Sequence, residues 1–331
     1  MNPLFFLHTR PQLALDVGTA NIRVISAAEG VLLDEPAICC FDRSHSPSKL
    51  VAAGAEAQPM VDRTTKGLKI HRPLYRGVLQ DLDAARALLG YARKRGLRGG
   101  RSSAMPTLIG IPADATEVER RALLTAAREA GFGPVRLVSE PMAAAIGAGL
   151  PISEAHGSML VECGAGTTEV VVISLGGVAV RHTVRVGGDA LDQMICDHVH
   201  LEHRLAIGAQ TAHRVKIELS DLAYRDADAL ISLSGRHLET GLPKVLTLPA
   251  ADFEPVTRKH ARLIVEAVKA CFAMTPPELS RDICEFGVTL TGGSANLPWL
   301  QSMISDVSGL DVIVAAQADR CVAKGLQRML Q

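Results

Sequence analysis

The feature that most constrains this chain is a short pattern that occurs twice. Residues 13–26 and residues 159–174 each read as an apolar strand, a tight turn with glycine and threonine, and a second apolar strand. A carboxylate stands just before each turn, Asp16 in the first copy and Glu162 in the second. Similarity between such distant segments predicts two related halves, each built round its own sheet.

Both turns have the chemistry of a phosphate-binding loop. Glycine at a hairpin tip lets backbone N–H groups approach an anion without interference from Cβ, and threonine hydroxyls add further donors. A carboxylate does not bind phosphate directly, so we expect Asp16 and Glu162 to orient a hydrated Mg²⁺. Either hairpin alone would read as an ordinary glycine-containing turn. The recurrence of acid, glycine and threonine in one order favours two loops that hold one nucleotide.

Length and composition agree with two α/β domains. A chain of 331 residues exceeds what one hydrophobic core usually supports. Apolar residues make up 47% and aromatic residues only 3%, which suits helices packed closely on sheets. Lys plus Arg equals Asp plus Glu, at 35 each, so no nucleic-acid partner is expected.

Two segments raise the question of membrane contact. No run reaches the roughly 18 apolar residues of a membrane span. The N-terminal patch Leu4, Phe5, Phe6 and Leu7 fits either shallow insertion into a bilayer interface or packing on its own domain. The basic, glycine-rich segment 93–101 reads as a solvated loop, with contact to anionic lipid as the alternative.

A glutamate occupies a position typical of catalytic groups. Residues 107–112 read as a buried strand, and Thr116 with Glu119 forms a capping box that starts a helix. A further strand at 135–138 leads to Glu140 at the start of another helix. Sheets of α/β proteins place catalytic groups at such strand ends. The alternative role for Glu140 is complementing the positive end of the helix dipole.

A histidine cluster offers a competing site. His198, His200 and His203 lie with Glu202 on a predicted helix, and His200 and His203 share one face. The order is not that of a zinc-protease helix, and zinc would need further ligands. The sequence therefore favours a polar helix surface over a metal site.

Five segments together resemble the MreB/Mbl family of bacterial actin-like cell-shape proteins. They are residues 16–21, 139–151, 164–169, 186–189 and 290–295, and the likeness runs in order from about residue 13 to residue 330. Such a collinear match is far more specific than a single glycine motif.

The resemblance implies an actin-like (ribonuclease H-like) α/β fold, with two related domains flanking a nucleotide cleft and a smaller subdomain in each. Domain I would span 1–145, with its small subdomain at about 31–73. Domain II would span 146–331, with its small subdomain at about 187–243, and the C-terminal helix at 319–331 would pack back on domain I.

The resemblance also implies ATP and Mg²⁺ as ligands, with site residues carried over by position. Asp16 and Glu162 would hold the metal through water, Glu140 would orient the attacking water, and Thr167 would lie near the terminal phosphate. The implied nucleotide-binding residues are Asp16, Gly18, Thr19, Ala20, Asn21, Glu162, Gly164, Ala165, Gly166, Thr167, Thr168, Gly188, Asp189, His213, Arg214, Lys216, Gly292, Gly293, Ser294 and Ala295.

The chain departs from the family pattern within this set. Glu162 stands where the family usually has Asp, and Ala165, Ser294 and Ser220 stand where it usually has glycine. His213 stands where it usually has Glu, and a neutral imidazole accepts only one hydrogen bond. If position 165 required positive φ, Ala165 would be strained. Because these residues would line one cleft, weaker nucleotide binding and at most a slow ATPase activity are consistent with the sequence.

Three functions follow from the residues and the resemblance. The first is an ATP-binding, filament-forming cytoskeletal protein, cytoplasmic and peripheral to the cytoplasmic membrane, with itself and cell-shape and wall-synthesis proteins as partners. The second is a non-polymerising actin-like scaffold with weakened or lost nucleotide binding. The third, a small-molecule kinase of the same superfold, is disfavoured because no general base for a substrate hydroxyl is evident.

Overall fold

The structure is a computed structural model that describes residues 10–97, 105–222 and 229–331. The chain forms two compact units, unit 1 from residues 1–154 and 319–331 and unit 2 from residues 155–318. The division lies after helix α3 (Glu140–Ala148), whereas the boundary expected at residue 145 falls inside that helix.

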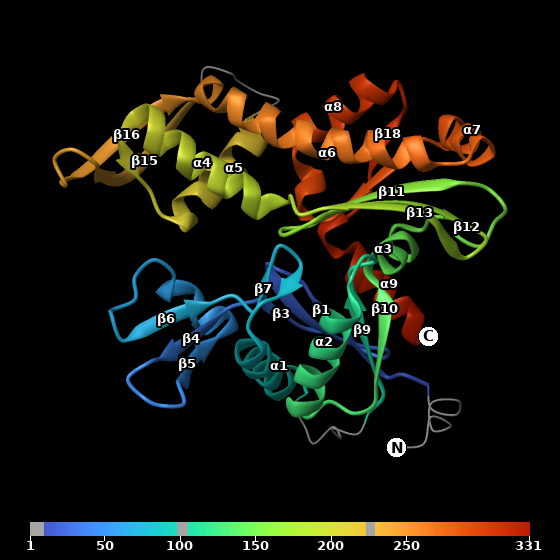
Figure 1. Cartoon of the computed structure of the whole chain (residues 1–331), viewed down its shortest axis with the longest axis horizontal. Helices are drawn as coiled ribbons and strands as arrows, with labels where there is room; N and C mark the ends of the chain where they lie inside the picture. Colours follow the sequence, from blue (N-terminus) through green and yellow to red (C-terminus); the bar gives the residue numbers. More distant parts are fainter. Residues whose placement is uncertain (1–9, 98–104, 223–228) are drawn as a thin grey trace. The chain divides into compact units, whose positions relative to one another are not determined.

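Unit 1 is built on a five-stranded sheet in the order β10-β9-β1-β2-β3 (Figure 1). Strands β1, β2 and β3 form an antiparallel meander, and β9 and β10 extend the sheet in parallel with β1. The strands are β1 (Leu13–Val17), β2 (Asn21–Ser26), β3 (Gly30–Pro36), β9 (Thr107–Ile111) and β10 (Val135–Ser139).

Helices cover both faces of this sheet. Leu15 of β1 packs in one cluster with α1 (Leu82–Gly96) and α2 (Glu117–Glu129), and the neighbouring Ala14 packs in another with α3 and α9 (Cys321–Leu330). Successive residues of a strand point to opposite faces, so β1 is buried along its whole length and is apolar apart from Asp16. The predicted capping box of Thr116 and Glu119 at the start of α2 is confirmed.

A small three-stranded sheet is inserted after β3. Its order is β5-β4-β6, with β4 (Cys39–Asp42), β5 (Lys49–Ala53) and β6 (Leu68–His71) around a cluster of their own. The small subdomain was expected from residue 31, but residues 31–36 belong to β3 of the main sheet. A short hairpin of β7 (Leu74–Tyr75) and β8 (Val78–Leu79) follows β6.

Unit 2 repeats the topology of unit 1. Its sheet has the order β13-β12-β11-β17-β18, with an antiparallel meander of β11, β12 and β13 and parallel strands β17 and β18. The prediction of two related α/β halves is therefore confirmed. The strands are β11 (Ser158–Cys163), β12 (Thr168–Ser174), β13 (Gly177–Val184), β17 (Val288–Thr291) and β18 (Val312–Val314).

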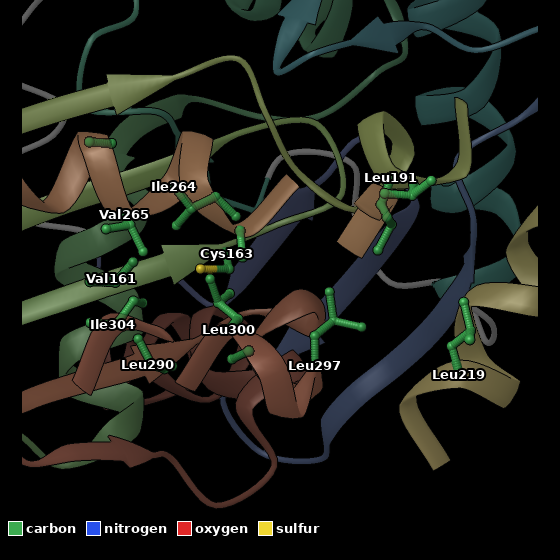
Figure 2. Close-up of a cluster of buried hydrophobic side chains, with 14 of the residues drawn as sticks. Val161, Cys163, Leu191, Leu219, Ile264, Val265, Leu290, Leu297, Leu300 and Ile304 are labelled. Carbon is green, nitrogen blue, oxygen red and sulfur yellow. The ribbon is translucent and has the colours of Figure 1, made fainter. Parts of the chain in front are cut away.

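One continuous core joins this sheet to the helices of unit 2. Figure 2 shows Val161 and Leu290 of the sheet beside Ile264 of α6 and Leu300 of α8. The core continues to α4, α5 and a small sheet in the order β14-β15-β16. The helices are α4 (Gly188–His203), α5 (Ala209–Leu222), α6 (Glu254–Met274), α7 (Pro277–Phe286) and α8 (Pro298–Ser308), and the small strands are β14 (Leu205–Ala206), β15 (Leu230–His237) and β16 (Pro243–Pro249).

None of the helices in the described ranges is both long enough and apolar enough for a membrane span.

Helices α3 and α9 of unit 1 cross in direct backbone contact (Figure 1). A Cβ on Gly147 would lie 1.8 Å from the carbonyl oxygen of Cys321, and a Cβ on Gly325 would lie 1.7 Å from that of Ala143. Only glycine at both positions permits this approach, which holds the C-terminal helix on unit 1.

We expect Gly147→Ala to destabilise the protein. The added methyl meets backbone that must move, and such overpacking costs about 1–3 kcal/mol. Gly90→Ala is the matched control, because its methyl would meet no atom within 4 Å in the middle of α1, where Ala is about 1 kcal/mol better than Gly. Urea midpoints should fall for the first variant and not for the second. A Gly147→Ala protein as stable as wild type would contradict the contact.

A buried histidine connects α6 to the start of α4. His260 is fully buried, and its Nε2 donates to the carbonyl oxygen of Gly187 at 3.0 Å. Burial lowers the pKa of His260 to about 4, although the bond to Gly187 offsets part of this effect. The imidazole is therefore neutral in the folded protein at neutral pH.

This burial predicts a pH dependence of stability. Unfolded His titrates near 6.5, so between about pH 6.5 and pH 4 the unfolded chain binds more protons than the folded one. The free energy of unfolding should fall as pH falls through this window, by up to about 3 kcal/mol. His260→Gln should flatten the profile relative to wild type in urea titrations, and His45→Gln, at an exposed histidine, should not. An unchanged slope in His260→Gln would disprove the assignment.

Candidate functional site

The first predicted hairpin loop lies between β1 and β2 of unit 1. The N–H of Gly18 donates to the carbonyl oxygen of Asn21 at 3.0 Å, and a Cβ on Gly18 would lie 3.2 Å from that oxygen. Thr19 is buried, and its hydroxyl accepts from the N–H of Gly77, in the turn between β7 and β8, at 3.3 Å. The loop is thus closed on itself and held from one side by a neighbouring turn.

Asp16 lies directly before this loop and is 5% exposed. Its Oδ2 accepts from Nη1 of Arg23 at 2.9 Å, and Nε of Arg23 lies 3.0 Å from Asp34 Oδ2. Burial raises the pKa of Asp16, and Arg23 offsets part of that rise. The other oxygen, Oδ1, lies 3.8 Å from the position of a Cβ on Gly18. One carboxylate oxygen is therefore held by Arg23, and the other faces the loop.

Glu140 lies at the carboxyl end of the same sheet. It is the first residue of α3, and its Cγ lies 3.1 Å from the position of a Cβ on Gly110 in β9. Strand β9 pairs with β1, whose Leu15 is the register partner of Ile109. The absence of a side chain at Gly110 lets Glu140 extend over β9, between the ends of β10 and β1.

The second predicted loop lies between β11 and β12 of unit 2. The N–H of Gly164 donates to the carbonyl oxygen of Thr167 at 2.9 Å, which is the same closing bond as in unit 1. The carboxylate oxygens of buried Glu162 lie 3.7 and 3.8 Å from the position of a Cβ on Gly164. Ala165 has no positive φ. The strain that a positive φ at position 165 would have caused is therefore absent.

The start of α4 packs backbone to backbone on this loop. The N–H groups of Gly188 and Asp189 donate to the carbonyl oxygens of Gly164 and Ala165, at 3.0 and 2.9 Å. A Cβ on Gly187 would lie 2.5 Å from both of these oxygens. Only glycine allows the helix to approach so closely, and the contact fixes the loop to the N-terminus of α4.

The predicted nucleotide-binding residues 292–295 are attached to the same hairpin. Gly292 has φ +85°, and a Cβ there would lie 2.3 Å from the carbonyl oxygen of Cys163. Ser294 is buried and its hydroxyl donates to the carbonyl oxygen of Gly164 at 3.0 Å, while Ala295 is also buried. A Cβ on Gly293 would meet no atom within 4 Å. Gly293 therefore presents bare backbone at an open position.

Helix α5 contributes one of its predicted residues directly to this group. The ammonium of buried Lys216 donates to the carbonyl oxygen of Gly188 at 3.0 Å and lies 2.9 Å from Asp192 Oδ1. Nδ1 of His213 lies 3.1 Å from Asp192 Oδ2, so Asp192 joins the two residues. Arg214 instead pairs with Glu218 and donates to Ser232 O at 2.6 Å, which directs it toward β15.

Two of these partners, Arg23 and Asp192, were not among the site residues predicted from the sequence. Arg23 could have been found, because counting outward from the turn makes Asp16 and Arg23 register partners. Asp192 had no comparable signal, since its role depends on how α4 packs against α5.

The structure thus brings the unit 1 residues together around one loop and the unit 2 residues, apart from Arg214, around another. The N-terminal patch Leu4, Phe5, Phe6 and Leu7 lies outside the described residues.

Comparison with known proteins gives a consistent picture. The family model for MreB/Mbl protein matches residues 10–331. The chain is 39% identical to the cell shape-determining protein MreB of Escherichia coli (strain K12) over 322 residues, which covers 96% of this chain and 93% of that protein. It is 35% identical to Mbl of Bacillus subtilis (strain 168) over 318 residues, with coverage of 96% and 95%.

Solved structures agree with the fold. The chain matches MreB5 of Spiroplasma citri bound to AMPPNP with a TM-score of 0.89 and 31% identity, covering 96% of this chain and 95% of that one. A MamK double helical filament matches with a TM-score of 0.77 at 20% identity, covering 96% and 97%, which supports the fold alone. With a family match over nearly its whole length and relatives above 30% identity, this chain belongs to the MreB/Mbl family and is an actin-like cytoskeletal homologue.

Proposed function

We propose that the protein binds ATP with Mg²⁺ and assembles into filaments that organise cell shape and cell-wall synthesis at the cytoplasmic membrane. The observation that carries this proposal is the similarity to Spiroplasma citri MreB5, which the chain matches with a TM-score of 0.89. The two MreB5 structures are bound to AMPPNP and to ADP. In both glycine-threonine hairpins one backbone hydrogen bond closes the turn, and successive N–H groups in a turn can form an anion-binding concavity.

We propose that each hairpin supplies backbone and hydroxyl donors for the phosphates. In unit 2 the first N–H groups of α4 are bonded to the hairpin, so the helix would contribute the positive end of its dipole rather than N–H donors to an anion there. Lys216 adds a positive charge beside Gly188. Gly293 would admit the adenosine, because a flat base can approach backbone that carries no side chain.

Asp16 and Glu162 fit a role in holding hydrated Mg²⁺. Each carboxylate stands beside the glycine of its own hairpin, and Mg²⁺ prefers oxygen ligands and retains several waters. When bound, the ion would offset the negative charge of the phosphates. The ion pair of Asp16 with Arg23 fixes the orientation of that carboxylate.

The departures from the family pattern are accommodated within unit 2, which supports retained binding over a nucleotide-free scaffold. Ala165 is unstrained, and the hydroxyl of Ser294 donates to Gly164. Ser220 donates to the carbonyl oxygen of Asn296 at 3.1 Å, which ties α5 to the residue that follows 292–295. His213 is paired with Asp192. Ser294, Ser220 and His213 thus each have a hydrogen-bond or ion-pair partner within unit 2.

Hydrolysis, assembly and location extend the same proposal. Glu140 would orient the attacking water, with Thr167 near the terminal phosphate, because phosphoryl transfer depends mainly on positioning. Further copies of the chain and cell-shape and wall-synthesis proteins would be its partners. We assign the peripheral membrane contact to residues 4–7.

Nucleotide binding should be visible as thermal stabilisation. Saturating ATP with Mg²⁺ should raise the melting temperature of the wild type, because a ligand at about 100 times its Kd adds about 2.7 kcal/mol. Asp16→Ala should lose the shift, while Asp83→Ala, which removes an exposed carboxylate from α1 of unit 1, should keep it. The comparison uses each variant's own melting temperature without ATP as its reference. Absence of a shift in wild type would favour the nucleotide-free scaffold.

A substitution of Glu140 should slow ATP hydrolysis without affecting filament assembly. Wild type should sediment with ATP and form filaments in electron micrographs. Glu140→Ala should sediment as wild type does. It should release phosphate at least ~100-fold more slowly, since a positioned general base contributes at least that factor. The matched variant Glu278→Ala, in the first turn of α7, should behave as wild type. Failure of wild type to sediment would contradict the cytoskeletal role, and unchanged phosphate release in Glu140→Ala would exclude Glu140 as the positioning group.

A further inference from the structure

Two histidines and an aspartate converge at the end of α4 in unit 2. His198 and His203 belong to α4, and Asp252 belongs to the short 3₁₀ helix η4 (Ala250–Phe253) that precedes α6. Nε2 of His198 lies 2.8 Å from Asp252 Oδ2, and Nε2 of His203 lies 2.9 Å from the same oxygen. The three atoms lie within 4.8 Å of one another, so a single ion could contact all of them.

The surrounding packing holds both rings in place. The ring of His198 lies against fully buried Phe253, with centroids 5.6 Å apart, and meets the ring of His203 edge-on at 5.7 Å. The side chains of His198, His203 and Asp252 are 15%, 21% and 27% exposed. The cluster is therefore shielded on its inner side by an apolar wall but remains accessible to solvent, as a site that is loaded from solution must be.

The charge of the cluster suits a cation. Asp252 supplies a carboxylate whose Oδ2 lies within hydrogen-bonding distance of both imidazoles. In the metal-free arrangement both Nε2 atoms direct a hydrogen at one oxygen. Binding of an ion there requires each Nε2 to give up that hydrogen, because a ligating imidazole nitrogen carries none.

We propose that His198, His203 and Asp252 form a binding site for a divalent transition-metal ion of the zinc class, with water completing the coordination. Two imidazole nitrogens and one carboxylate oxygen are a donor set that suits zinc, whereas Mg²⁺ and Ca²⁺ prefer oxygen ligands alone. The ion would join the C-terminal end of α4 to the segment that enters α6, and so would stabilise unit 2 independently of nucleotide.

The ligand set differs from the one considered in the sequence. His200 is exposed and lies outside the three-residue cluster, and the carboxylate comes from η4 rather than from Glu202. A substitution of His200 is therefore a matched control, because it removes a histidine from the same helix without touching the site.

The test measures metal binding to the full-length, untagged protein after chelator treatment and without nucleotide. Calorimetry with Zn²⁺ should give one site per chain that millimolar Mg²⁺ does not displace. Asp252→Asn and His203→Gln should each weaken binding by more than the ~10–100-fold typical of losing an outer-shell partner. His200→Gln should bind as wild type. Zn²⁺ should also raise the melting temperature of wild type and of Asp16→Ala alike, which separates this site from the proposed nucleotide site.

Three results would overturn the proposal. They are no Zn²⁺ binding by wild type, equal binding by wild type and Asp252→Asn, and a loss in His200→Gln as large as in Asp252→Asn. Circular dichroism checks that each variant is folded. If Asp252→Asn fails to fold, His203→Gln and the visible spectrum of Co²⁺ bound to wild type decide, since Co²⁺ in a four-coordinate zinc-type site absorbs far more strongly than the octahedral aqua ion.

Discussion

The arrangement of unit 2 depends on backbone packing against backbone at the second hairpin. Gly187 brings the start of α4 onto the carbonyl oxygens of Gly164 and Ala165, and Gly292 brings residues 292–295 onto Cys163. No side chain would fit at either glycine without moving the main chain. The phosphate-binding candidates are thereby held by main-chain geometry, which tolerates changes in neighbouring side chains.

This constraint explains how the unusual residues are accommodated. Ser294 stands where the family usually has glycine, and its hydroxyl donates to the carbonyl oxygen of Gly164. The hydroxyl of Ser220 donates to the carbonyl oxygen of Asn296. Both serines thus add hydrogen bonds to an arrangement that the backbone contacts already fix. Lys216 and His213 are connected through Asp192. The candidate site is therefore a bonded network in which the polar substitutions take part.

The repeat of topology was predictable because it is encoded locally. The hairpins at residues 13–26 and 159–174 show their strands as apolar runs and their turns by glycine, and each segment forms a hairpin in the sheet of its own unit. The C-terminal helix was likewise visible in its apolar face. Its contact with α3 was not, because the fit of Gly325 against Ala143 depends on two helices distant in sequence.

The residues alone were sufficient for the α/β class, the doubled hairpin and the family, because each of these is carried by short contiguous patterns. Long-range partners required the folded chain. Arg23 on Asp16, Asp192 between His213 and Lys216, and Asp252 beside two histidines become neighbours only when separate strands and helices pack. Charge pairing and metal ligation act over a few ångströms in space, and distance along a chain does not report that separation.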